Sequence, residues 1–245
     1  MSFEVITYAT HSERMFPELI NSGYPIKVLG WGEKWENFLT KIRGVLSYVK
    51  TKHPDDIIVC VDAFDTIINR DPKEAEKIFK SMDCGFLVSN DLYYNFLLGL
   101  RHKFNFGTCQ GEYTANMGLW MGYVKYIIPI LEAVVSKKCG DDQINFNSVC
   151  SDYEFIKIDV ENKVFLNKKG NDTRESIFHG YPGTGSMNLS RILKSFFVDY
   201  MGRTIILLTL LLYMLSTLFP IMNYLWIPFV MTFLLYSNKS CTFIS

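Results

Sequence analysis

Two carboxylates three residues apart follow a short apolar run in this chain. Asp62 and Asp65 come directly after the β-branched run Ile57–Val61, which predicts a buried strand. Acidic side chains at the end of such a strand lie where open α/β sheets bind ligands. Mg²⁺ and Mn²⁺ prefer oxygen ligands and usually bind through one or two carboxylates together with substrate phosphates. The pair therefore indicates a metal site for a nucleotide diphosphate; alternatively, Asp62 caps the next turn and Asp65 is solvated.

A histidine at the end of a later strand is a third candidate ligand. His179 ends the predicted strand 176–179 and is followed by Gly180, so its side chain is placed to reach a ligand. An imidazole added to two carboxylates would complete three protein ligands and leave positions open for diphosphate oxygens. Taken alone, a histidine in this position is more often a hydrogen-bonded loop residue.

Further charged residues have both a functional and a structural interpretation. Asp141 and Asp142 open a predicted helix, where acids usually act as caps and partners of the helix dipole. In the functional interpretation, one of them is a base or positions a sugar. Lys41 and Arg43 lie on the predicted helix before the acidic strand, where they either reach phosphate or belong to a solvated helix face.

The order of the predicted elements favours an α/β fold. Strand and helix patterns alternate up to residue 90, which implies a mostly parallel, Rossmann-like sheet with flanking helices. A less regular second half follows, in which residues 91–114 are predicted to form a loop. The predicted strands are 3–9, 26–29, 57–61, 85–89, 116–122, 155–158, 164–166 and 176–179, and the predicted helices are 12–21, 35–49, 72–82, 124–135 and 141–149.

The composition changes near residue 200. Residues 204–238 contain no Asp, Glu, Lys or Arg, and this uncharged run exceeds the roughly 20 residues needed to cross a bilayer once. We therefore expect a domain over residues 1–200 and a hydrophobic membrane anchor over residues 201–245. Pro220 and Pro228 interrupt the run, so it forms either one long kinked span or a hairpin of two short helices.

Other features of the composition bear on localisation and partners. The first residues show no secretory signal, which predicts a C-terminally anchored membrane protein whose soluble domain is cytosolic. The six cysteines have no C-x-x-C spacing, so neither a zinc site nor a disulfide framework is expected. Three glycosylation sequons, at Asn171, Asn188 and Asn238, are then chance matches. The net charge is zero and no basic run contains interleaved aromatics, so nucleic acid is not an expected partner.

Several motifs, in matching order and spacing, carry a family resemblance over residues 3 to about 185. The chain resembles the GT-A-type glycosyltransferase domain of animal procollagen lysyl hydroxylases, which uses UDP-sugars and Mn²⁺. The segments that are similar to this family are Val5-Ile6-Thr7-Tyr8-Ala9-Thr10, Val28-Leu29-Gly30-Trp31-Gly32-Glu33-Lys34-Trp35, Lys41-Ile42-Arg43, Val61-Asp62-Ala63-Phe64-Asp65, Asn116-Met117-Gly118, Asp141-Asp142-Gln143 and Phe178-His179-Gly180.

The resemblance implies a role for each matching position. Together with the expected membrane anchor, it implies a membrane-anchored hexosyltransferase that transfers galactose or glucose from UDP-galactose or UDP-glucose to a protein or glycan acceptor. The implied metal ligands for Mn²⁺ are Asp62, Asp65 and His179; the donor-binding residues are Thr10, Lys41, Phe64, Asn116 and Gly180; and the catalytic residues near the sugar are Asp141 and Asp142.

Two segments depart from the family pattern. The family sequence H-G-N-G-P-T-K is replaced by residues 179–185, which lack an asparagine and a lysine that would face the diphosphate. The tryptophan-containing acceptor loop after the fourth strand is replaced by residues 91–94. The alternative function is therefore an inactive nucleotide-sugar-binding or scaffolding protein that has kept the fold.

Overall fold

The computed structural model describes residues 2–91, 96–111, 113–137, 139–168 and 173–181, together with Leu211 and Tyr213. The chain divides into two compact units, Met1–Gly185 and Ser186–Ser245. All strands and helices named below belong to the first unit. The expected boundary at residue 200 stays a prediction.

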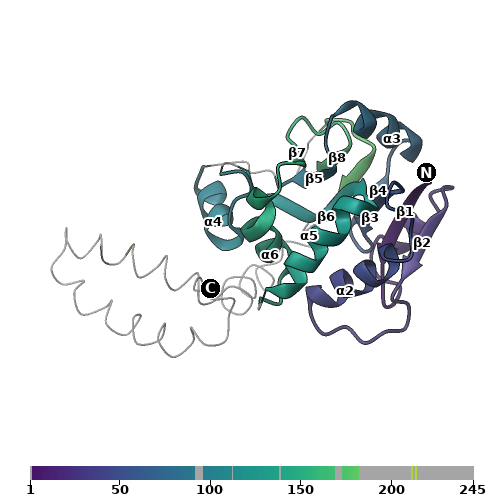
Figure 1. Cartoon of the computed structure of the whole chain (residues 1–245), viewed down its shortest axis with the longest axis horizontal. Coiled ribbons are helices and arrows are strands. Elements are labelled where there is room, and N and C mark those ends of the chain that lie inside the picture. The colour runs from purple at the N-terminus through teal and green to yellow at the C-terminus, as the bar shows by residue number, and fades with distance from the viewer. Residues whose placement is uncertain are drawn as a thin grey trace. The chain divides into compact units, whose positions relative to one another are not determined.

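A six-stranded mixed sheet forms the centre of the first unit, in the order β2-β1-β3-β6-β5-β7 (Figure 1). Strand β6 runs antiparallel to both of its neighbours, β3 and β5, whereas the other pairs are parallel. Strands β1, β2, β3 and β5 therefore end at one edge of the sheet, here called the carboxyl edge. The strands are β1 (Phe3–Tyr8), β2 (Ile26–Leu29), β3 (Ile57–Asp62), β5 (Phe86–Asn90), β6 (Ala115–Tyr123) and β7 (Ile156–Asp159).

A second, three-stranded sheet has the order β4-β9-β8. Strand β4 (Thr66–Ile68) begins four residues after β3 ends and pairs antiparallel with β9 (Phe178–Gly180). Strand β8 (Phe165–Asn167) pairs parallel with β9 on its other side. This small sheet therefore brings the end of the last strand in the described part of the chain next to the turn that follows β3.

Helices and the small sheet cover the two faces of the large sheet. Ile58 and Cys60 of β3 point into one core, together with apolar residues of α2, α5 and α6. Their neighbours Ile57 and Val59 point into the opposite core, which contains residues of α3, β8 and β9. This alternation is the period of two that a strand buried on both faces requires. The helices are α1 (Phe16–Ile20), α2 (Phe38–Val49), α3 (Pro72–Ser81), α4 (Phe96–Phe106), α5 (Val124–Ser136) and α6 (Asp142–Val149), with a 3₁₀ turn at Cys150–Asp152.

The predicted α/β class and its flanking helices are confirmed, with two local differences. Helix α4 occupies part of the segment predicted as a loop, and the short strand β4 was not predicted. Gly99, inside α4, costs a helix about 1 kcal/mol relative to alanine, and no polar stripe alternates with the helix's apolar residues. Packing against α6, rather than local sequence preference, therefore accounts for the helix.

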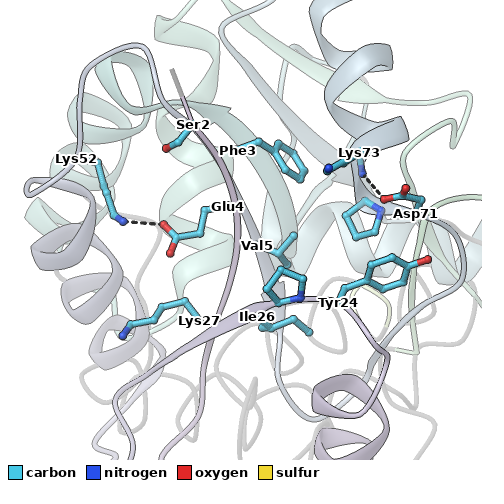
Figure 2. A pocket seen from close by; sticks show the side chains of 12 residues that line it. Ser2, Phe3, Glu4, Val5, Tyr24, Ile26, Lys27, Lys52, Asp71 and Lys73 are labelled. Atoms are coloured by element: carbon cyan, nitrogen blue, oxygen red, sulfur yellow. Dashed lines mark hydrogen bonds and ion pairs between the residues drawn. The ribbon is translucent and has the colours of Figure 1, made fainter.

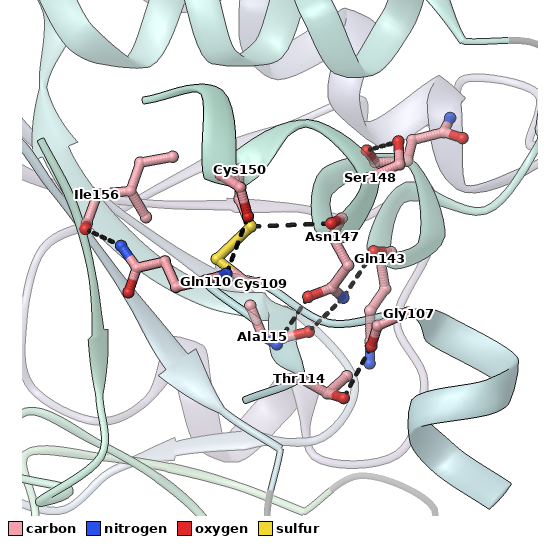
Figure 3. The surroundings of a disulfide bond; sticks show 12 residues. Gly107, Cys109, Gln110, Thr114, Ala115, Gln143, Asn147, Ser148, Cys150 and Ile156 are labelled. Carbon is pink, nitrogen blue, oxygen red and sulfur yellow. Dashed lines mark hydrogen bonds between the residues drawn. A yellow bond between two sulfur atoms is a disulfide. The ribbon is translucent and has the colours of Figure 1, made fainter. Parts of the chain in front are cut away.

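A disulfide joins Cys109 to Cys150, so the expectation that the cysteines form no disulfide is wrong. The two residues are 41 positions apart, with their Cα atoms 5.6 Å apart (Figure 3). Cys109 follows α4 by three residues and Cys150 directly follows α6, so the bridge ties the ends of these two helices together. Nothing in local spacing indicates such a pair, because the fold brings the two residues together.

The structure does not support the expected C-terminal transmembrane helix. Within the described part of the chain, no helix has the length and apolar character that a membrane span requires. Residues 204–238, to which the expectation referred, lie outside the described residues except for Leu211 and Tyr213, which are helical. The fold class that the structure supports is therefore the α/β domain alone.

The disulfide yields a stability prediction. Replacing Cys109 and Cys150 together with alanine should lower the free energy of unfolding by about 4 kcal/mol, because the cross-link closes a long loop in the unfolded chain. Urea unfolding of the oxidised protein and of the double variant measures this difference. Cys84→Ala, which removes a cysteine thiol that is free, is the control. Dithiothreitol should destabilise the wild type more than the double variant; equal midpoints for all proteins would contradict the prediction.

Candidate functional site

The site is built at the carboxyl edge, where β1 and β3 end side by side. Tyr8 and Asp62, the last residues of these strands, are paired in the sheet. The Asp62 side chain is 38% exposed. The turn that follows carries Phe64 and Asp65 and leads directly into β4. The backbone of Asp62 is thus held in the sheet, whereas its side chain is partly accessible to solvent.

Lys41 is the centre of a buried ion network at this edge. Its ammonium group lies 3.0 Å from Oδ1 of Asp62 and 2.8 Å from Oδ2 of Asp142, and the Lys41 and Asp142 side chains are each only 8% exposed. It also donates to the Met117 carbonyl at 3.4 Å. Burial alone would lower the pKa of Lys41, but the charges of Asp142 and Asp62 outweigh burial and hold that pKa well above its ordinary value.

The two basic residues of α2 therefore differ in their exposure to solvent. Lys41 is buried and links β3 to α6, whereas Arg43 is exposed. The solvated-face interpretation fits Arg43 and fails for Lys41.

A glycine on β6 permits this close arrangement. A Cβ atom on Gly118 would lie 2.5 Å from Oδ2 of Asp62 and 2.8 Å from Oδ1 of Asn116. The same Asn116 oxygen accepts a hydrogen bond from the Gly118 backbone N–H at 2.7 Å. The β5–β6 pairing is irregular here, since Val88 pairs with Trp120 but Ser89 pairs with Asn116. On the other side of β6, Val61 pairs with Leu119, and this β3–β6 register places Gly118 beside Asp62.

The other two predicted ligands lie on neighbouring segments. The backbone carbonyl of Asp65 accepts a hydrogen bond from the Tyr181 N–H at 2.6 Å, next to the end of β9. His179, on β9, is 2% exposed and its Nε2 accepts from the Ser176 N–H at 3.2 Å. Among the residues that the structure describes, no group of three or more His, Cys, Asp or Glu side chains is placed to hold a metal ion. The ligand set Asp62, Asp65 and His179 therefore stays a prediction.

The other predicted site residues lie at the start of α6 and after the ends of β1 and β3. Asp141 caps α6 by accepting a hydrogen bond from the Ile144 N–H at 2.9 Å, as the structural interpretation expected. Thr10 Oγ1 lies 2.9 Å from Nδ1 of His11, whose ring centroid is 5.2 Å from that of Phe64. Thr10 and Phe64 thus lie together beyond the ends of β1 and β3. Residues 182–185, which contain the departure from the family loop, lie outside the described residues.

One group of polar residues was missed. Asp91 follows β5 at the same edge, and its Oδ2 lies 3.1 Å from both Nδ1 of His102 and Nε2 of Gln143. The feature that identified Asp62, an acid just after an apolar strand, applies equally to Asp91. His102 was not recognisable, because the helix that carries it was predicted as a loop.

A separate cavity of about 620 Å³ lies at the opposite ends of β1 and β2. Its lining includes Phe3, Tyr24 and Ile26, with Lys73 from the start of α3 (Figure 2). Glu4 in its wall is paired with Lys52 at 2.8 Å. None of the candidate site residues lines this cavity, so the cavity is separate from the candidate site.

Comparison with known proteins defines the class of this domain. Residues 2–178 match the family model of the PLOD GT domain, a glycosyltransferase domain. The chain belongs to this family, which confirms the resemblance to the procollagen lysyl hydroxylases. A glycosyltransferase domain uses a nucleotide-sugar donor and an acceptor.

Two solved structures are also similar to the chain. The crystal structure of the galactosyltransferase LgtC in complex with donor and acceptor sugar analogues has 12% sequence identity and a TM-score of 0.46, and the match covers 74% of this chain and 87% of that chain. The crystal structure of A197 from STIV has 13% identity and a TM-score of 0.39, with 61% and 78% covered. No curated protein matches the chain.

The ion network yields a second prediction. Lys41→Met should lower the free energy of unfolding by about 3 to 5 kcal/mol, because the buried carboxylate of Asp142 loses its counter-charge. The double variant Lys41→Met/Asp142→Asn should recover part of that loss, since the uncompensated charge is removed. Urea unfolding of each variant measures the effect.

The matched control is Lys50→Met, at the other end of the same helix, whose ion pair with Glu132 is half exposed. Exposed pairs contribute at most about 1 kcal/mol. If Lys41→Met and Lys50→Met were equally stable, the buried network would not hold β3 and α6 together.

Proposed function

We propose that this glycosyltransferase domain transfers a hexose, galactose or glucose, from a UDP-sugar to a hydroxyl group of a protein or glycan acceptor, with Mn²⁺ as cofactor. The observation that carries the proposal is the buried contact of Lys41 with Asp62 and Asp142. It joins the first acid of the D-x-x-D turn to the Asp141-Asp142 motif, the two motifs that the family relationship connects with metal and sugar.

The types of side chain near the turn fit a divalent cation. Asp62 and Asp65 supply carboxylate oxygens and His179 supplies an imidazole, a set that suits Mn²⁺. The hydrogen bond from the Tyr181 N–H to the Asp65 carbonyl joins the acidic turn to the end of the strand that bears His179. Held by these residues, the cation would neutralise the negative charge that develops on the departing diphosphate.

Residues of the chain itself would orient the donor. Lys41 engages Oδ1 of Asp62, so the carboxylate is held in one orientation before a ligand arrives, and such preorganisation lowers the cost of reaching the reactive geometry. Phe64 and Thr10 lie beyond the strand ends, where an aromatic ring can stack on a nucleobase. The Asp142 carboxylate is neutralised by Lys41, so it positions α6 instead of repelling a diphosphate.

Donor binding gives a direct test. At 100 times its dissociation constant, UDP-galactose or UDP-glucose with Mn²⁺ should stabilise the wild type by about 2.7 kcal/mol, which raises the melting temperature by roughly 5 to 10 °C. The double variant Asp62→Asn/Asp65→Asn should lose this protection and the accompanying release of UDP, because it lacks two carboxylate ligands. Thermal unfolding and a UDP-release assay, each with and without Mn²⁺, measure the two effects.

Asp55→Asn is the matched control, since Asp55 is an exposed acid paired with Lys125 away from the carboxyl edge. It should retain both protection and turnover. Protection without any UDP release in the wild type would favour the inactive nucleotide-sugar-binding alternative. Equal protection in the wild type and the Asp62/Asp65 variant would exclude these two acids as metal ligands.

A further inference from the structure

A buried asparagine joins the small sheet to the large sheet at the carboxyl edge. Asn167 is the last residue of β8 and is only 2% exposed. Its amide nitrogen donates hydrogen bonds of 3.0 Å to Oγ of Ser89 and 2.9 Å to the carbonyl of Asn90, the last two residues of β5. Because a buried amide is stable only when it is hydrogen-bonded, these bonds hold the end of β8 against the end of β5.

Ser89 extends this connection to β6. The residue is fully buried, and its hydroxyl donates to the Asn116 carbonyl at 3.0 Å. Ser89 and Asn116 are paired across the irregular part of the β5–β6 ladder. The Asn116 side chain accepts from the Gly118 N–H, next to Asp62. A single hydroxyl group therefore connects Asn167 to the strand that borders the acidic turn.

Asn167 also contacts the end of β9. Asn167 and Gly180 are paired in the small sheet, and the N–H of Lys168 donates to the Gly180 carbonyl at 2.7 Å. A Cβ atom on Gly180 would lie 2.8 Å from Oδ1 of Asn167 and 3.0 Å from Cδ1 of Leu119 on β6. Gly180 fits between the Asn167 amide and β6 because it has no side chain.

We propose that Asn167 is a positioning residue for donor binding, an assignment that rests on the proposed hexosyltransferase function. The proposed donor-binding residues Asn116 and Gly180 lie on different strands, and Asn167 is connected to both. Its amide holds the two segments at the separation that the diphosphate requires, before the donor arrives. A site that is ordered in advance binds its ligand without the entropic cost of ordering it.

The effect of Asn167 falls on donor binding, because the residue acts through the segments that contact the donor. Without its two hydrogen bonds, the end of β9 is ordered by the donor itself, and the dissociation constant of the donor rises. The net contribution of one hydrogen bond corresponds to roughly tenfold in an equilibrium constant. Once the donor is bound, the same arrangement is restored, so the chemical step is little changed.

The test measures kcat and KM for UDP release by the full chain with Mn²⁺, water as the acceptor, and UDP-galactose or UDP-glucose, whichever the wild type cleaves faster. Asn167→Ala should raise KM roughly tenfold while kcat stays near the wild-type value. Thermal protection should likewise require about tenfold more UDP at saturating Mn²⁺. Asn167→Leu, which has a similar side-chain volume and leaves no cavity, should behave in the same way. Ser89→Ala should raise KM in the same direction.

Asn145→Ala is the matched control. Asn145 is also 2% exposed, and its amide donates to the carbonyls of Val134 and Cys139 at 3.2 and 2.7 Å. Asn145→Ala and Asn167→Ala should both lower the free energy of unfolding in urea, but only Asn167→Ala should raise KM. A merely structural role of Asn167 would leave KM unchanged in both variants.

The outcomes separate this inference from the proposed function. A wild-type KM in the variants of Asn167 and Ser89, or an equal rise in Asn145→Ala, would overturn the inference and leave the proposed function standing. A loss of kcat at unchanged KM would also overturn it. A wild type with neither thermal protection nor UDP release with either UDP-sugar would overturn the proposed function itself.

Discussion

A single buried ammonium group holds the two halves of the site together. Lys41 contacts Asp62 at the end of β3 and Asp142 at the start of α6, and no other residue in the described chain contacts both acids through an ion pair. Removing a charged side chain from water is costly unless its partners are close. The network therefore fixes the spacing between two motifs that lie about 80 positions apart in the chain.

The remaining features of the site follow from that spacing. Gly118 lacks the side chain that would collide with Asp62, and the register of β3 with β6 places the glycine there. The small sheet brings the end of β9 against the acidic turn by pairing it with β4. Residues from the first, middle and last parts of the domain thus lie close together at the carboxyl edge. The positive charge of Lys41 balances the negative charges of the acids there.

The sequence pattern predicted the elements whose conformation depends on residues that are close together in the chain. The strand that begins at Ile57 follows from its β-branched residues, and α3 begins at Pro72 as predicted, with Asp71 as its cap. The reversed direction of β6 did not follow, because it depends on how strands pair in space. The choice between Lys41 and Arg43 as the buried cation depends on tertiary packing in the same way.

The missed parts of the site have one physical origin. The pairing of Cys109 with Cys150 and the helical conformation around His102 are decided by contacts between α4 and α6, not by the residues beside them. Asp91 was within reach of sequence reasoning, since it follows β5 as Asp62 follows β3. Membership of the PLOD GT domain family, by contrast, was evident from motif order alone.

The disulfide also makes the β5 side of the site sensitive to the redox conditions around the protein. Two helices that carry His102 and Gln143 are joined by a bond that persists in oxidising compartments and is lost where glutathione keeps thiols reduced. The same polypeptide would thus hold the β5 side of the carboxyl edge firmly in one cellular environment and loosely in another. The strand that carries Asp62 and the helix that carries Lys41 contain no such bond among the described residues.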